Sequence, residues 1–248
     1  MRLADIAVDC RLPETAIRER VREIEHAILS GSRCIRAANF TSINSQDLAF
    51  LFDAYDPRFF DGECRRALDG RRLAFRLSTR MTKAGGKTTR FRTNSGYVYF
   101  EIAIACGLLF DGFNYQDRMV TVCGVECNTR LEALQRIFEH ELVHLIEQLC
   151  WVDSDCAAAR FQTISSGHFR HQAHTHHLIT RDERAARAGI RPGSRVGFSF
   201  EGRQLRGCVN RITKRATVLV EDAEGHPFSD GRRYKTYYVP IPILIPLS

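Results

Sequence analysis

The residues best placed to do chemistry are His140, Glu141 and His144, which form an HExxH motif. On a helix, side chains four positions apart lie on one face with Cβ atoms about 5–6 Å apart, so two imidazoles can bind one zinc ion together. Zinc lowers the pKa of a bound water toward ~7, and Glu141 is placed to take the proton of that water. The motif therefore predicts a hydrolytic site with one Zn²⁺ per chain.

A catalytic zinc needs a third protein ligand, and the sequence offers several candidates. Cys156 lies twelve residues after His144, near the expected start of the next helix, where a helix dipole would stabilise a thiolate. We expect Cys156 to be the third ligand and His171 to be the second choice. The segment that follows the motif contains further candidates, which are His168, His174 and His176.

The motif requires a helix, and the surrounding residues predict one that begins near Thr129. Thr129 and Glu132 fit a capping box, in which each side chain bonds a backbone N–H group of the first turn. No glycine or proline interrupts the next twenty or so residues. The apolar positions recur at helical spacing, namely Leu131, Leu134, Phe138 and Leu142.

The elements expected around this helix are both helical and extended. Helices are predicted at 14–30, from Ser45 to just before Pro57, at 63–68, and from Asp153 or Ser154 onward. Strands are predicted at 72–80, 97–105 and 118–124, with the paired glycines of 81–90 in a loop or hairpin turn. This mixture predicts an α+β fold.

The last part of the chain differs in charge and pattern. A boundary is expected near 180–193, and beyond it four or five short alternating segments predict a small SH3-like or Tudor-like β-barrel at 191–248. Ten Lys and Arg residues against five Asp and Glu give this part +5 of the chain's net charge of +7. Such an excess suggests a polyanion partner such as a nucleic acid, and the alternative is a solvated basic surface. The candidate contact residues are Arg211, Lys214, Arg215, Arg232, Arg233 and Lys235.

Several segments, taken in order, resemble the SprT-like metallopeptidase family, which includes the Spartan proteases. They are LAFLFDAYDPRFFDG, the SxRMTKAGGKT stretch from Ser78, YFEIAIACGLL, RIFEHELVHLIEQL, and ARFQTI followed by THHL. The resemblance covers roughly residues 40–180. It implies a zincin-like metallopeptidase domain with His140 and His144 as zinc ligands and Glu141 as general base. Spartan members cleave proteins attached to DNA.

The sequence departs from the family pattern at the third ligand. The family usually takes this ligand from an HGxxF-type motif, and if Phe161 matches its aromatic residue, the histidine position is Ala157. The family's ligand is therefore not carried over, and Cys156 is the immediate neighbour of the vacant position.

The composition limits the remaining classes of protein. The chain has 248 residues and 44% apolar residues, with no apolar run near the ~20 residues that span a bilayer and no signal-peptide stretch at its start. We expect a cytoplasmic protein with no membrane partner, whose nine cysteines are mostly buried thiols. Cys123 and Cys127 form a CxxxC pair, but no second pair lies at zinc-finger spacing.

The expected organisation is a helical extension at 1–39, a metallopeptidase domain at 40–180 and the basic barrel at 191–248. The expected function is hydrolysis of peptide bonds in a protein or peptide substrate, with Glu141 activating a zinc-bound water and with DNA-associated proteins as candidate substrates. The alternative is a nucleic-acid-binding protein in which the zinc site is structural or degenerate.

Overall fold

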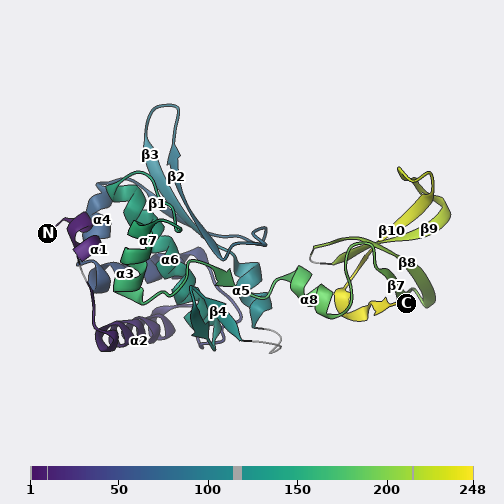
Figure 1. The fold of residues 1–248 in the computed structure, drawn as a ribbon, viewed down its shortest axis with the longest axis horizontal. Coiled ribbons are helices and arrows are strands. Elements are labelled where there is room, and N and C mark those ends of the chain that lie inside the picture. Colours follow the sequence, from purple (N-terminus) through teal and green to yellow (C-terminus); the bar gives the residue numbers. More distant parts are fainter. Residues whose placement is uncertain (1, 10, 114–118, 214, 248) are drawn as a thin grey trace. The chain divides into compact units, whose positions relative to one another are not determined.

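The chain folds into two compact units, Met1–Leu178 and Ile179–Ser248. The structure is a computed structural model that describes residues 2–9, 11–113, 119–213 and 215–247. Within these ranges it contains eight α-helices and three sheets (Figure 1), which confirms the predicted α+β class. Across the same ranges, no helix combines the length and the apolar character needed to cross a bilayer.

The first unit contains seven helices and six short strands among its described residues. The helices are α1 (Leu3–Asp9), α2 (Glu14–Gly31), α3 (Ser45–Phe59), α4 (Glu63–Leu68), α5 (Cys106–Gly112), α6 (Arg130–Cys150) and α7 (Ala159–Phe169). The strands are β1 (Leu73–Leu77), β2 (Gly86–Arg92), β3 (Val98–Ile104), β4 (Val120–Val122), β5 (Val125–Cys127) and β6 (His176–His177).

Helix α6 is the centre of this unit and carries the HExxH motif. It begins where predicted, and the Thr129 side chain accepts a hydrogen bond from the backbone N–H of Glu132. The Glu132 carboxylate accepts from the backbone N–H of Asn128 at 2.6 Å, so only the Thr129 half of the predicted capping box forms. Most of its residues are buried, since it packs against β2, β3, α5 and α7. Phe138, fully buried, packs at a tilt against the ring of Tyr55 from α3, with 5.8 Å between centroids. Both flanks of the motif are therefore fixed by core packing.

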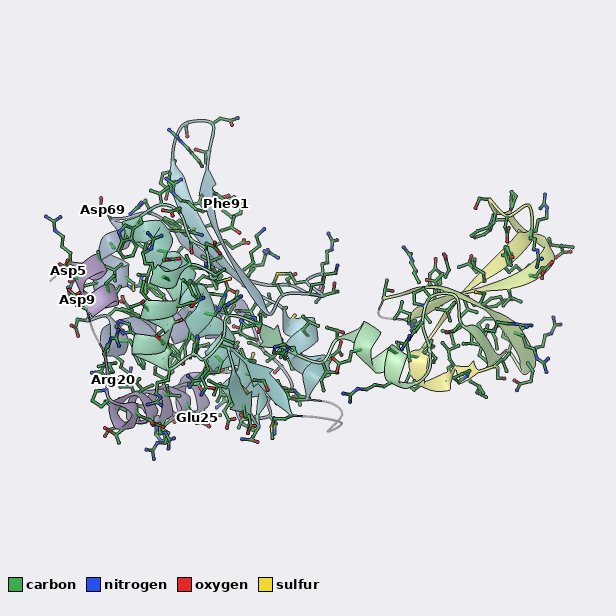
Figure 2. The ribbon with its side chains drawn as sticks, in the orientation of Figure 1. Asp5, Asp9, Arg20, Glu25, Asp69 and Phe91 are labelled. Carbon is green, nitrogen blue, oxygen red and sulfur yellow. The ribbon has the colours of Figure 1, made fainter. Side chains whose placement is uncertain are left out.

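A three-stranded sheet in the order β1-β3-β2 lies beside α6. Strand β3 runs parallel to β1 and antiparallel to β2, so β2 forms an edge next to the helix. The β2–β3 hairpin extends beyond the helices (Figure 1), and Figure 2 shows Phe91 on it. The Phe91 ring stacks on Tyr99 at 4.8 Å between centroids. A second small sheet has the order β5-β4-β6.

Three local expectations differ from the structure. Asn44, rather than Ser45, caps α3 in a capping box with Asp47, and the helix continues through Pro57 to Phe59. Pro57 lies in the last turn, where the missing N–H group costs only one hydrogen bond. The glycine-rich stretch is not all loop, because Gly86 begins strand β2. Helix α7 begins at Ala159, later than predicted, so the residues before it form a turn.

The second unit is a helix followed by an antiparallel sheet in the order β10-β9-β8-β7-β11. The sheet buries a small core that includes Val196, Phe198, Val209 and Val218. Strands β10 and β11 are opposite edges, so the strand pairing of the described residues does not close a barrel. The elements are α8 (Arg181–Arg187), β7 (Arg195–Phe200), β8 (Arg203–Ile212), β9 (Ala216–Pro227), β10 (Arg233–Val239), the 3₁₀ turn Ile241–Ile243 and β11 (Ile245–Pro246).

Candidate metal centre

The structure brings together the three ligands favoured from the sequence. His140 and His144 lie one turn apart on α6, with their Nε2 atoms 3.1 Å from each other. Cys156 lies in the turn before α7. One ligand atom from each of the three lies within 4.8 Å of the others. All three side chains line the same hollow as Glu141.

A chain of polar groups fixes the protonation of His144. Its Nδ1 lies 2.6 Å from Ser154 Oγ, and the Ser154 hydroxyl donates to Glu147 Oε2 at 2.7 Å. The other carboxylate oxygen of the fully buried Glu147 accepts from Arg160 Nε at 2.7 Å. Because the serine proton is committed to Glu147, Ser154 must accept from His144 Nδ1–H. Nε2 of His144 then carries the lone pair that faces His140.

His140, like His144, carries its proton on Nδ1. Its Nδ1 lies 3.6 Å from Cys123 Sγ, and the Cys123 thiol donates to the Arg136 carbonyl oxygen at 3.9 Å. Burial raises the pKa of Cys123 well above its usual range, so the thiol keeps its proton. Burial and the neighbouring His176 and His144 lower the pKa of His140 to about 2. The ring is therefore neutral, with its Nε2 lone pair directed at His144.

This arrangement fits a shared metal ion better than it fits a metal-free pair. Two lone pairs that face each other at 3.1 Å repel unless a cation lies between them. Two Zn–N bonds of about 2.0–2.1 Å meeting at a tetrahedral angle place the nitrogens about 3.3 Å apart, close to what is found. Imidazole nitrogens and a cysteine thiolate are both groups that zinc binds in proteins. The donor chemistry thus suits zinc.

The Cys156 thiol does not lie in the environment that the sequence suggested. The helix α7 begins three residues later, so its dipole does not act directly on the sulfur. Desolvation, and then the charge of Asp155, raise the pKa of Cys156. A bound cation would have to displace the thiol proton, as metals do at cysteine ligands.

Glu141 lies beside the two histidines and is held by strand β2. Thr88 Oγ1 lies 2.8 Å from Glu141 Oε2 and 2.9 Å from the backbone oxygen of Glu141. Burial raises the pKa of this carboxyl group to about 8. Gly86 is required for the close approach, because an added Cβ would lie 2.6 Å from Glu141 Oε1. The glycine pair predicted as a turn therefore also makes room for the Glu141 carboxyl group.

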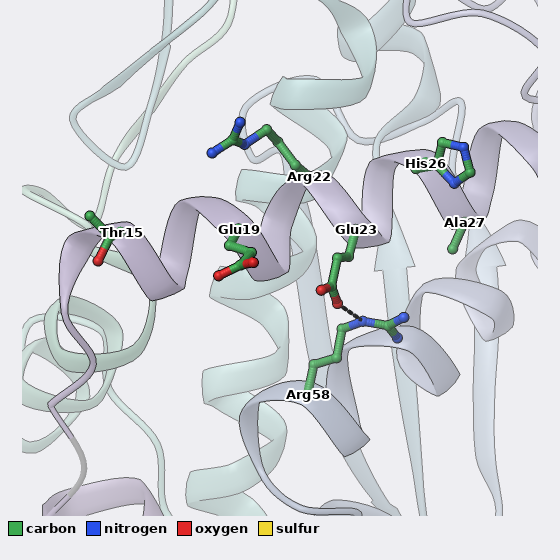
Figure 3. Close-up of a pocket in the computed structure, with 7 residues that line it drawn as sticks. All are labelled: Thr15, Glu19, Arg22, Glu23, His26, Ala27 and Arg58. Carbon is green, nitrogen blue, oxygen red and sulfur yellow. Dashed lines mark hydrogen bonds and ion pairs between the residues drawn. The ribbon is translucent and has the colours of Figure 1, made fainter.

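The hollow around these groups has a volume of about 630 Å³. The edge strand β2 forms one wall, and the exposed Lys83 and Lys87 lie at its rim. His174, His176 and His177 line another side. A different hollow, of about 720 Å³, lies along α2 (Figure 3), but its lining contains no group of metal ligands.

A second group of residues could also hold a metal ion. Cys123, His140 and His171 each offer a ligand atom within 4.8 Å of the others, and all three are buried. His171 was the second choice for the third zinc ligand, and it lies here rather than with His144 and Cys156. Cys127, the partner of Cys123 in the CxxxC pair, is in neither group within the described residues.

The remaining candidate histidine, His168, has a structural position. Its ring is fully buried, and Nε2 lies 3.2 Å and 3.3 Å from the backbone oxygens of Ile6 and Ala7. Its ring also packs against Phe60 at 4.7 Å between centroids. This side chain therefore ties α1 to α7 and is not part of either metal-holding group.

The basic residues of the second unit are partly neutralised. Lys235 Nζ lies 3.0 Å from Asp222 and 3.2 Å from Glu224, and Arg232 pairs with Glu221 at 3.3 Å. Arg233 donates to the Gly225 carbonyl oxygen, and Arg211 donates to the Thr217 hydroxyl group. Arg215 is exposed, and Lys214 lies outside the described residues. Charge alone therefore overstates the basic surface of this sheet.

Sequence reasoning missed the groups that hydrogen-bond to the candidate ligands and to Glu141. Thr88 and Ser154 are ordinary hydroxyl residues in the sequence, and only their contacts reveal a role. Cys123 was noted only as half of a CxxxC pair, which gives no sign that it faces His140. No family model, no curated protein and no solved structure was found to match this chain, so the argument for the site rests on its own geometry.

Proposed function

We propose that this chain is a zinc-dependent metallopeptidase with a zincin-like first unit of the SprT type. His140, His144 and Cys156 hold the zinc ion, and Glu141 is the general base. The observation that carries the proposal is the pair of Nε2 atoms of His140 and His144 at 3.1 Å, with the buried carboxyl group of Glu141 on the same helix and in the same hollow. A structural zinc would not require a carboxylate beside an open hollow of this size.

The zinc ion would supply Lewis acidity, polarising a scissile carbonyl group and lowering the pKa of water toward ~7. Burial favours the neutral form of Glu141, and the charge of a zinc ion beside it would favour the ionised form. In that ionised form Glu141 accepts a proton and passes it on to the leaving amine. Thr88 holds the Glu141 carboxylate in place by its 2.8 Å contact to Oε2, and so acts as a positioning residue. Ser154 and Cys123 keep the Nδ1 proton on the two histidines, so that each Nε2 is available as a ligand.

Strand β2 suggests how a substrate would lie. It is the edge of its sheet, and its residues Gly86, Lys87 and Thr88 line the hollow. A peptide in extended conformation can pair with an edge strand through main-chain hydrogen bonds, without requiring a particular sequence. The substrate class is therefore an unfolded protein segment or an extended peptide.

The test is cleavage of fluorescein-labelled casein by the full chain loaded with zinc. Glu141→Gln keeps the size of the side chain and removes the base, so we expect a rate loss of at least about 100-fold with the zinc content unchanged. The matched control is Glu126→Gln, an exposed carboxylate on β5, which should cleave at the wild-type rate. If Glu141→Gln cleaves as fast as the wild type, Glu141 is not the base and the proposal fails.

The nucleic-acid alternative has less support from the geometry. Lys235 and Arg232 are engaged with acidic neighbours, which lowers the charge available to phosphates. Among the tyrosines of β10, Tyr237 packs against Phe198 and Phe200, while Tyr238 is 60% exposed. We therefore place the function in the first unit.

A further inference from the structure

Behind the proposed catalytic position lies a second cluster of ligand groups around the other nitrogen of His140. Cys123 follows strand β4 and has a positive φ of 53°, in a turn completed by Gly124 at 76°. This turn presents the Cys123 sulfur 3.6 Å from His140 Nδ1. His171 comes from the segment after α7, and its ligand atom lies within 4.8 Å of the other two. All three side chains are buried.

His171 carries its proton on Nε2, which leaves the lone pair of Nδ1 available to bind a metal ion. Its Nε2 lies 2.9 Å from Glu139 Oε2, and this buried carboxylate also accepts from Tyr55 at 2.8 Å and from Arg136 at 2.7 Å. Glu139 accepts the Nε2 proton of His171, so the lone pair of this ring is on Nδ1. The His171 side chain is 1% exposed, and its Nδ1 has no hydrogen-bond partner. A carboxylate that orients a histidine in this way is typical of metal ligands.

His176 adds a second unpartnered nitrogen to the same region. Its ring lies 4.7 Å from the His140 ring between centroids, and its Nε2 is buried without a hydrogen-bond partner. Buried polar atoms in native structures nearly always have partners, so two such nitrogens flanking one imidazole call for an explanation. A metal ion held by Cys123, His140 and His171 would satisfy the His171 nitrogen.

We infer that Cys123, His140 Nδ1 and His171 form a second, closed position for a thiophilic divalent metal ion such as zinc. Binding there displaces the Cys123 thiol proton to solvent and requires the Nδ1 proton of His140 to move to Nε2 or to leave. A neutral imidazole has a single lone pair, so His140 serves one position at a time. A metal in the closed position therefore removes His140 from the catalytic set.

This competition rests on the proposed peptidase site, but the closed position does not. The closed position has no route for a substrate carbonyl group, since its three ligands are buried. Metal held there would be retained in an inactive form of the chain. The two positions differ in their sulfur ligand, Cys156 in the open one and Cys123 in the closed one, and this difference makes them distinguishable.

The test uses Co²⁺ in place of zinc in the full chain that carries Cys156→Ala. Cys156 lies in a surface turn, so its removal leaves the fold intact. We expect one Co²⁺ per chain, with the sulfur-to-metal charge-transfer absorption that marks a thiolate ligand. Adding Cys123→Ser should abolish that absorption, and the serine hydroxyl can still bond the Arg136 carbonyl group. Adding Cys127→Ser instead, at a buried thiol outside the cluster, should leave it unchanged.

Each outcome decides the inference independently of peptidase activity. Absence of the sulfur absorption in Cys156→Ala would show that no second thiolate site exists and would overturn it. A sulfur-to-metal absorption that survives Cys123→Ser would also overturn the inference. Two Co²⁺ ions bound at once by the wild-type chain would refute the competition, because His140 would then bridge them. If the absorption behaves as expected but casein is not cleaved by the zinc-loaded wild type, only the proposed function fails.

Discussion

Ser154 controls the protonation of a proposed zinc ligand without touching the metal. Replacement by alanine removes the acceptor that lies 2.6 Å from His144 Nδ1 and the donor that lies 2.7 Å from Glu147 Oε2. His144 is then free to place its proton on Nε2, the atom that must ligate. Loss of such a supporting hydrogen bond typically weakens metal affinity by about 10–100-fold, which corresponds to about 1.4–2.8 kcal/mol.

The measurement is a zinc affinity from competition with a chromophoric chelator. Ser154→Thr keeps the hydroxyl group and should bind nearly as tightly as the wild type. Ser166→Ala is the matched control, because Ser166 is exposed and its hydroxyl bonds only within its own helix, to the Thr163 carbonyl group. If Ser154→Ala binds zinc as tightly as Ser166→Ala, the serine does not set the tautomer of His144 and the reasoning is wrong.

Three further predictions follow from the surroundings of the site. Gly86→Ala should lower casein cleavage on the order of 100-fold with zinc content unchanged, since its Cβ would lie 2.6 Å from Glu141 Oε1 and displace the base; unaltered kcat would contradict this. Phe161→Ala should lower the free energy of unfolding in urea by about 3–5 kcal/mol, because this 1%-exposed ring packs on both ligand histidines; a loss under 1 kcal/mol would argue against it. Burial lowers the pKa of His168 in the folded state, so its contribution to stability is present above the unfolded pKa of about 6.5 and is lost as the pH falls below it. Between pH 7.5 and 5, the unfolding free energy of metal-free His168→Gln should therefore fall less than that of the metal-free wild type, by up to about 1.4 kcal/mol per pH unit. Equal slopes of unfolding free energy against pH for the two proteins would exclude this contribution of His168.

Much of the fold around the site could be predicted because the signals are local. The cap at Thr129 and the uninterrupted apolar periodicity fix α6, and a helix necessarily places His140 and His144 on one face. The β3 region was equally clear, since seven residues from Val98 onward favour extended structure. The start of α7 was placed too early because Asp153 and Ser154 look like caps, whereas Ser154 is engaged with Glu147 and His144.

What the sequence by itself determined is the chemistry of one helix: two imidazoles and a carboxylate at a spacing that suits a metal. What the tertiary structure decided is which other groups reach that helix. Cys123, Thr88 and Ser154 come from three separate segments, 17, 53 and 10 residues from their respective contacts on α6. Such contacts depend on how strands and turns pack against the helix, and short-range patterns contain no information about that packing. For the same reason, the division of the cysteines and histidines between two metal-holding groups emerges only once the chain is folded.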